Sequence, residues 1–113
     1  MVRYTRLLKI KKTSTFSDSD VKESDIQKKI LNWLKSEGYW AVKTISTNRN
    51  GTPDILTCVN GRFVGIEVKT PTGKTSKLQD YQINAIIEAG GHAFVARSVD
   101  DVKKALDNVL PKV

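Results

Sequence analysis

Two carboxylates and a lysine in the middle of the chain have the residue types of a site for a divalent metal ion: Asp54, Glu67 and Lys69. Asn60-Gly61 lies between the two acids and is a strong signal for a two-residue hairpin turn. Counting outward from such a turn places Asp54 opposite Glu67, with Cβ atoms about 4.5–5.5 Å apart. Lys69 projects from the same face as Glu67, because side chains alternate along a strand. One face of the hairpin is therefore predicted to collect two carboxylates and an ammonium group.

Two directly opposed carboxylates repel each other, so a purely structural sheet would avoid this pair. A hard divalent cation converts the repulsion into coordination, because ions such as Mg²⁺ prefer carboxylate oxygens. The competing interpretation is that Asp54 caps a turn and that Glu67 and Lys69 form a solvent-exposed charge pair. Ile66 and Val68 alternate with these residues and are predicted to point into the core. This alternation and the hairpin register together favour the metal site.

The hairpin lies within a regular series of predicted elements. A helix is expected from about residue 21 to Gly38, with Asp20 as its N-cap, because apolar residues recur there at helical spacing. The remaining predicted elements are strands at 39–45, 54–59, 62–69 and 92–97, a helix at 76–89, and a last helix capped by Ser98 that ends before Pro111. This order predicts an α/β domain with a mixed sheet of about four strands flanked by helices.

The composition is that of one globular domain, with 113 residues, 39% hydrophobic and 27% charged. A net charge of +7 favours an anionic partner, nucleic acid before an acidic membrane. The charge is uneven, because residues 1–12 hold five basic and no acidic residues, whereas the rest holds 14 basic and 12 acidic residues. We therefore expect residues 1–20 to be a basic arm and linker, and residues 21–113 to be the functional domain. The arm is predicted to bind DNA or to add an extra strand, with a solvated tail as the third alternative.

Membrane and redox features exclude further classes. No apolar run approaches the roughly 18 residues of a membrane span, and the first twenty residues lack a signal-peptide core. The single cysteine, Cys58, excludes an internal disulfide and fits a reducing compartment. Its apolar neighbours predict a position in the core rather than a role as a nucleophile. These features indicate a cytoplasmic protein that does not bind membranes.

The residues around the carboxylates resemble a known family. Pro53-Asp54 followed by Glu67-Val68-Lys69 resembles the PD-(D/E)XK nuclease signature. The wider pattern, similar to the VRR-Nuc family, is Gly51-Thr52-Pro53-Asp54-Ile55, Ile66-Glu67-Val68-Lys69-Thr70, Ser76-x-x-Gln79 and Gly90. The resemblance spans residues 23 to about 100 and implies a restriction-endonuclease-like fold. It also implies a metal-dependent DNA endonuclease selective for branched DNA or four-way junctions, in a bacterial or phage-infected host cell.

The resemblance implies a role for each site residue. Asp54 and Glu67 would bind Mg²⁺ or Mn²⁺, joined by the backbone carbonyl of Val68 and by Glu23 from the preceding helix. Lys69 would either orient or deprotonate the attacking water, and would stabilise the developing negative charge. An alternative for Glu23 is a capping box with Asp20, in which Glu23 is the third helical residue.

Further residues are expected at the edge of the site. Gln79 would contact a phosphate or hold Lys69; its alternative is an ordinary polar helix residue. Arg49, Lys74 and Lys77 lie in the loops that should flank the metal, where cations hold phosphates. Solvated loop charges are the competing explanation.

Cutting both strands of DNA, or engaging a junction symmetrically, needs two sites, and one small chain offers one. We therefore expect a homodimer. Three alternatives stay open within the fold: a restriction-type endonuclease, a nicking endonuclease and a catalytically inactive DNA-binding module. The intact set of Asp54, Glu67 and Lys69 argues against the last of these.

Overall fold

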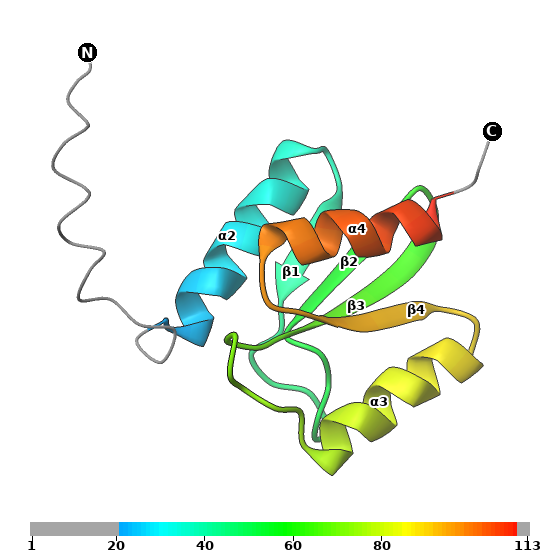
Figure 1. The fold of residues 1–113 in the computed structure, drawn as a ribbon. Coiled ribbons are helices and arrows are strands. Elements are labelled where there is room, and N and C mark those ends of the chain that lie inside the picture. The colour runs from blue at the N-terminus through cyan, green and yellow to red at the C-terminus, as the bar shows by residue number, and fades with distance from the viewer. Residues whose placement is uncertain (1–20, 111–113) are drawn as a thin grey trace, which may run out of the picture.

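A computed structural model describes residues 21–110 of the chain. The elements are α2 (Glu23–Ser36), β1 (Trp40–Lys43), β2 (Ile55–Val59), β3 (Arg62–Val68), α3 (Lys77–Glu88), β4 (His92–Ala96) and α4 (Val99–Val109). The strands form one sheet in the order β1-β2-β3-β4 (Figure 1). Strand β2 is antiparallel to both β1 and β3, and β4 runs parallel to β3. The prediction of a mixed four-stranded sheet with flanking helices is confirmed.

The hairpin between β2 and β3 has the predicted turn and register. Asn60 and Gly61 both have positive φ, 51° and 82°, as the central residues of a type I′ turn do. Val59 pairs with Arg62, and the pairing continues without a bulge to Ile55 and Ile66. Asp54 and Glu67 are the next residues along each strand. The turn chemistry therefore fixes which residues of β3 point to each face.

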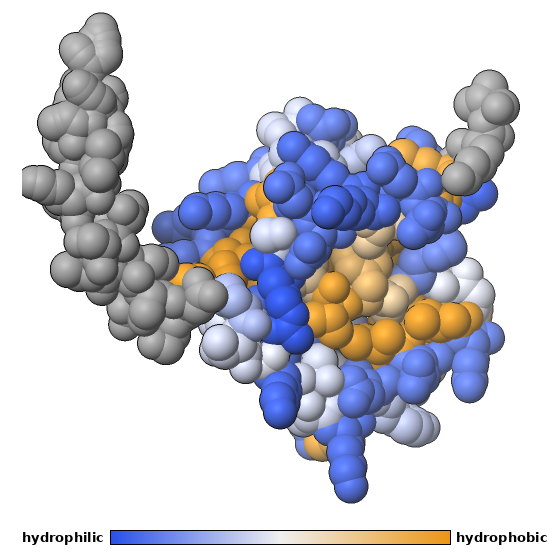
Figure 2. Space-filling view, in the orientation of Figure 1, coloured by the Kyte–Doolittle hydropathy of each residue, from blue (hydrophilic) through white to orange (hydrophobic). Residues whose placement is uncertain are grey.

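The core lies between one face of the sheet and the helices α2 and α4. Its fully buried side chains come from all three parts and include Ile30, Leu34, Ile55, Ile66 and Val102. Figure 2 shows the complementary pattern on the surface: apolar side chains gather between α4 and α3, where Figure 1 draws β4, and the outer sides of the helices are hydrophilic. No helix in residues 21–110 is long and apolar enough to span a membrane.

Helix α3 lies against β4, apart from the α2–α4 pair (Figure 1). Ser76 is its N-cap and Gly90, with φ 102°, follows its C-terminus. Helix α4 likewise begins after Ser98, whose side chain accepts a hydrogen bond from the Asp101 amide. The Ser98 cap confirms the sequence prediction, whereas Ser76, predicted as the first residue of its helix, is the N-cap. Ser at the N-cap and Gly after the last turn satisfy the free backbone groups of a helix end.

Two predictions about the fold are wrong. Helix α2 begins at Glu23 with Lys22 as its N-cap, so a start capped by Asp20, which lies outside the described residues, is excluded. Cys58 is exposed rather than part of the core. It pairs with Trp40 and Phe63 on the sheet face that α2 and α4 do not cover, and these two aromatic residues are 62% and 46% exposed. The apolar neighbours of Cys58 point to the opposite face.

Candidate functional site

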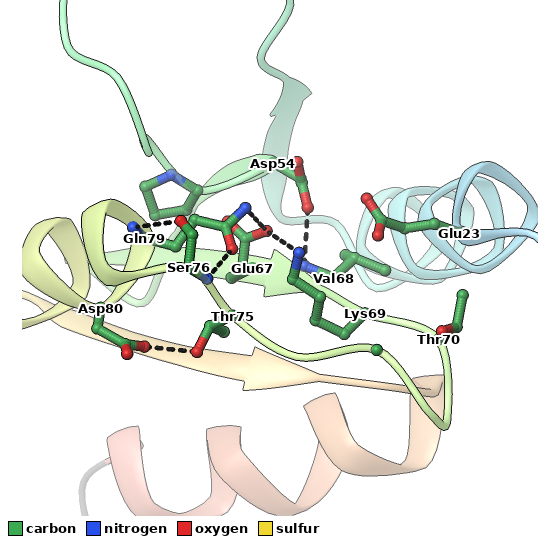
Figure 3. A network of polar contacts seen from close by, with 12 residues as sticks. Glu23, Asp54, Glu67, Val68, Lys69, Thr70, Thr75, Ser76, Gln79 and Asp80 are labelled. Carbon is green, nitrogen blue, oxygen red and sulfur yellow. Dashed lines mark hydrogen bonds and ion pairs between the residues drawn. The ribbon is translucent and has the colours of Figure 1, made fainter.

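Asp54 and Glu67 meet at the end of the hairpin that is remote from the turn (Figure 3). Asp54 precedes β2, and its backbone carbonyl accepts a hydrogen bond from the Thr44 amide at 2.8 Å. Its side-chain Oδ2 accepts a hydrogen bond from the Val68 amide at 2.9 Å. This bond ties the Asp54 carboxylate to the end of β3. The predicted pairing of the two acids is therefore held by the backbone as well as by register.

Glu67 is an ionisable side chain in a buried position. It is 1% exposed, and its two carboxylate oxygens have different surroundings. Oε2 accepts a hydrogen bond from Gln79 Nε2 at 2.9 Å, whereas Oε1 is buried and has no hydrogen-bond partner within residues 21–110. Burial first, and then the negative charge of the neighbouring Asp54, raise the pKa of Glu67 from 4.5 to about 8. Lys69 opposes this shift, and the charge of Glu23 adds to it.

Lys69 directly follows β3, and its amide donates to the Ala96 carbonyl at 3.0 Å. Its Nζ lies 3.7 Å from Glu67 Oε2, and the side chain is 13% exposed. That separation is an ion pair rather than a short hydrogen bond, so the ammonium group keeps donors for another partner. The predicted grouping of Asp54, Glu67 and Lys69 on one face is present (Figure 3).

Gln79 is oriented by a capping box at the start of α3. The Ser76 amide donates to Gln79 Oε1 at 2.9 Å, and the Gln79 amide donates to Ser76 Oγ at 3.2 Å. Because Oε1 is occupied as an acceptor, Nε2 is the atom that faces Glu67 and donates to it. Gln79 is expected from the family resemblance to contact a phosphate or to hold Lys69; its contact in the structure is with Glu67.

Glu23 is the first residue of α2, and Figure 3 shows its side chain directed toward Asp54. The capping-box alternative is wrong, because Glu23 would have to be the third helical residue and the N-cap, Lys22, makes no side-chain cap bond. Gln27, one turn further along α2, is buried and donates to Glu23 Oε2 at 3.4 Å. Gln27 is not among the residues that the sequence predicts for the site; its available signal is a polar residue at i+4 from Glu23 within an apolar stripe.

The loop before Asp54 packs directly on the first turn of α3. Gly51 has φ 85°, and a Cβ atom there would lie 2.6 Å from the Leu78 carbonyl carbon and oxygen. Only glycine combines this backbone conformation with so close an approach. The contact fixes the Asp54 loop relative to the helix that carries Gln79. Arg49, in the same loop, is exposed and lines a polar hollow together with Asp54.

The other two predicted phosphate-binding cations lie beyond Lys69. Lys74 is exposed in the segment that joins β3 to α3, as predicted. Lys77 is also exposed, but it is the first residue of α3 rather than a loop residue. Both side chains are available to solvent on the segment between Lys69 and Gln79.

The donor set fits a hard divalent cation. Asp54 and Glu67 supply carboxylate oxygens, which suit Mg²⁺ or Mn²⁺, and the partnerless, buried Oε1 of Glu67 needs a cation or a proton. Within residues 21–110, no three acidic, cysteine or histidine side chains are close enough to enclose an ion. Glu23 therefore stands at the edge of the site, and any full coordination shell would also need backbone oxygens or water.

Comparison with known proteins supports the fold and identifies the family. The chain matches the VRR-NUC domain family over residues 7–100. It is 30% identical over 94 residues to "Putative nuclease p44" of Acyrthosiphon pisum secondary endosymbiont phage 1, covering 82% of this chain and 96% of p44. Two solved structures, both described as VRR-NUC domains, share the fold. One has a TM-score of 0.67 at 24% identity, covering 78% of this chain and 97% of its own. The other has a TM-score of 0.65 at 18% identity, covering 78% and 87%. The chain therefore belongs to the VRR-NUC domain family of nucleases.

Proposed function

We propose that this protein is a divalent-metal-dependent DNA endonuclease that selects branched DNA or four-way junctions and acts as a homodimer. The observation that carries the proposal is the Glu67 carboxylate, which is buried next to Asp54. Its Oε1 has no hydrogen-bond partner within residues 21–110. An uncompensated buried carboxylate is costly unless it is protonated or binds a cation. A nuclease-family fold with this carboxylate pair supports metal-dependent phosphodiester hydrolysis.

Each residue has a distinct part in the proposed mechanism. Asp54 and Glu67 would hold a Mg²⁺ or Mn²⁺ ion, with the Val68 carbonyl and Glu23 as further oxygen donors. When bound, such an ion supplies charge neutralisation at the phosphate and lowers the pKa of water. Gln79 holds the Glu67 carboxylate in one orientation through its fixed amide. Its Oε1 is already satisfied, so only Nε2 acts on the acid.

Lys69 is the proposed proton-handling or charge-stabilising group. Its ammonium lies beside Glu67 without a short hydrogen bond, so it can turn toward a water molecule or a phosphate oxygen. Arg49, Lys74 and Lys77 would contact phosphates on either side of the scissile bond, because all three are exposed next to the site. The phage relative supports a site of action in the cytoplasm of a bacterial host cell.

The test is a cleavage assay with labelled duplex, single-stranded, flap and four-way-junction DNA in Mg²⁺, Mn²⁺ or EDTA. We expect metal-dependent cutting with preference for the branched substrates. Asp54→Asn is the sharpest variant, because asparagine can still accept the Val68 hydrogen bond while the charge is lost. Asp54→Asn and Lys69→Ala should abolish cutting and retain DNA binding.

Wild-type activity in either variant would refute the assigned roles. Equal cutting of all substrates would favour a nonselective or nicking enzyme, and sequence-dependent cutting would favour a restriction-type enzyme. Binding without cutting in every metal would identify a DNA-binding module. Light scattering coupled to size exclusion tests the homodimer, for which a monomeric mass at working concentration is the contrary result.

A further inference from the structure

Arg97 holds the turn that follows the proposed catalytic lysine. Its side-chain Nη1 donates to the Thr70 carbonyl and, at 2.7 Å, to the Gly73 carbonyl. Arg97 follows β4, so these two bonds join the end of one strand to the segment leaving its neighbour. Within residues 21–110, no carboxylate lies within ion-pair distance of the guanidinium. The two backbone carbonyls are therefore its recorded partners.

The turn that Arg97 holds lies beside Lys69. The Gly73 amide donates to the Thr70 carbonyl at 3.1 Å, which closes the turn. A Cβ atom on Gly73 would lie 3.0 Å from Thr70 Oγ1 and 3.6 Å from Lys69 Cδ. The backbone at Gly73 is therefore separated from the aliphatic stem of Lys69 by about the width of one methyl group. Within residues 21–110 the one ion pair of the ammonium is the 3.7 Å contact with Glu67, so its position also depends on where this turn places the backbone of Lys69.

Arg97 is itself fixed by the start of α4. Its amide donates to Asp101 Oδ2 at 2.9 Å, and the Asp101 amide donates to Ser98 Oγ at 3.1 Å. The Lys69 amide also donates to the carbonyl of Ala96, the residue before Arg97. The backbone of Arg97 is therefore fixed independently of its side chain. Loss of the two guanidinium bonds should make the Thr70–Gly73 turn more mobile without disturbing the pairing of β3 with β4.

The same turn continues into the capping box of α3. Thr75 Oγ1 donates to Asp80 Oδ1 at 2.6 Å, and the next residue, Ser76, orients Gln79. The segment between Thr70 and Ser76 thus joins Lys69 to the residue that holds Glu67 (Figure 3). If this segment became mobile, we expect Lys69 to be displaced more than Gln79, because Gln79 is also held by the capping box of α3.

We propose that Arg97 is a positioning residue for Lys69: by bonding the Thr70 and Gly73 carbonyls, it fixes the turn that directly follows Lys69 and so sets the ammonium beside Glu67. This proposal rests on the proposed function, because it assigns Arg97 to the cleavage step. Displacement of a reacting group by about 1 Å can cost up to 100-fold in rate. Arg97→Gln is therefore expected to slow the chemical step by about tenfold or more.

The experiment compares the full-length wild type with Arg97→Gln and with Arg62→Gln as a matched control. Arg62 lies beside the hairpin turn, at the opposite end of β3 from Lys69. The readouts are the single-turnover cleavage rate at saturating DNA, the Kd for DNA, and the rate of tryptic cleavage after Lys74. We expect Arg97→Gln to lower the rate, to leave the Kd within about twofold, and to accelerate cleavage after Lys74. Arg62→Gln should change none of the three.

Each contrary outcome has a distinct meaning. A weaker Kd with an unchanged saturated rate would make Arg97 a phosphate contact and overturn the proposal. An unchanged rate together with unchanged proteolysis would also overturn it. Arg97→Lys keeps a cation but not the guanidinium that bonds both carbonyls. Its DNA cleavage rate and its rate of tryptic cleavage after Lys74 should lie between those of the wild type and Arg97→Gln. If Arg97→Gln does not fold, as seen by circular dichroism, Arg97→Lys is compared with the wild type alone: a lower saturated rate with faster cleavage after Lys74 supports the proposal, and an unchanged rate overturns it.

The proteolysis readout separates this inference from the proposed function. If the wild type cuts no DNA in any metal, the proposed function fails, while cleavage after Lys74 still reports whether Arg97 holds the turn. If the wild type cuts DNA and Arg97→Gln cuts at the same saturated rate, only the role of Arg97 fails.

Discussion

Replacing Glu67 by glutamine should stabilise the metal-free protein while abolishing its cleavage activity. Glutamine is isosteric with glutamate, can accept the Gln79 hydrogen bond, and can direct its amide donors toward Asp54. Glu67→Gln therefore removes the buried charge without creating a cavity. The wild-type carboxyl, by contrast, must either stay protonated or ionise in a buried site when no cation is present.

The size and sign of the effect follow from the pKa of Glu67, raised from 4.5 to about 8 in the folded chain. Between these values the folded state binds a proton that the unfolded state has released, so the free energy of unfolding falls as pH rises through this window. One pKa unit corresponds to about 1.4 kcal/mol, which sets an upper limit of about 5 kcal/mol for the full loss. Allowing for relaxation and water entry, we expect about 2–4 kcal/mol between pH 5 and pH 8.5.

Urea unfolding in EDTA at pH 5, 7 and 8.5 measures this difference. Stability of the wild type relative to Glu67→Gln should fall steadily over the series, and excess Mg²⁺ at pH 8.5 should restore the wild type and leave the variant unchanged. Glu88→Gln, which alters an exposed acid at the end of α3, is the control and should follow the wild type. If the difference in free energy of unfolding between the wild type and Glu67→Gln does not change with pH, ionisation of the buried Glu67 carboxyl does not destabilise the folded protein, and the reasoning is refuted.

Three further perturbations test the surrounding structure. Gln79→Leu removes the donor to Glu67 Oε2 and should weaken Mn²⁺ binding by about 10–100-fold in calorimetric titration, with little loss of fold. Gly51→Ala and Gly61→Ala both place alanine at positive φ, but only the first meets backbone within 2.6 Å, so Gly51→Ala should lower the free energy of unfolding by at least about 1 kcal/mol more in urea melts. Deleting residues 1–12, which hold five basic residues, should weaken DNA binding and flatten its salt dependence while the single-turnover rate at saturation persists; failure to fold or dimerise would instead identify a structural strand.

The features that sequence predicted best are those set by local rules. Asn60-Gly61 determines the turn, the turn determines the register, and strand alternation then assigns Glu67 and Val68 to opposite faces. Each step depends only on neighbours along two paired strands. The pair of carboxylates can therefore be located from the sequence alone.

The features that sequence did not predict depend on how separate elements dock. Gln79 was placed near the site, but its partner could not be chosen, because that choice depends on where α3 sits on the sheet. The approach of Gly51 to Leu78 sets this placement, and a backbone contact between a loop and a helix leaves no periodic signal. The prediction for Cys58 is wrong for a related reason: the adjacent Thr57 and Val59 are buried, but their side chains point to the other face of the sheet.

The start of α2 shows how a structural and a functional explanation for one residue become separable. A capping box would use the Glu23 side chain to satisfy the helix backbone and would turn it away from Asp54. At the first helical position the acid is instead stabilised by the positive end of the helix dipole and needs no such bond. Its carboxylate is then free to accept from Gln27 and to face Asp54, where its charge raises the pKa of Glu67. Removing that charge in Glu23→Gln should therefore lower the pKa of Glu67 and reduce the pH dependence of stability, an effect that a capping role would not produce.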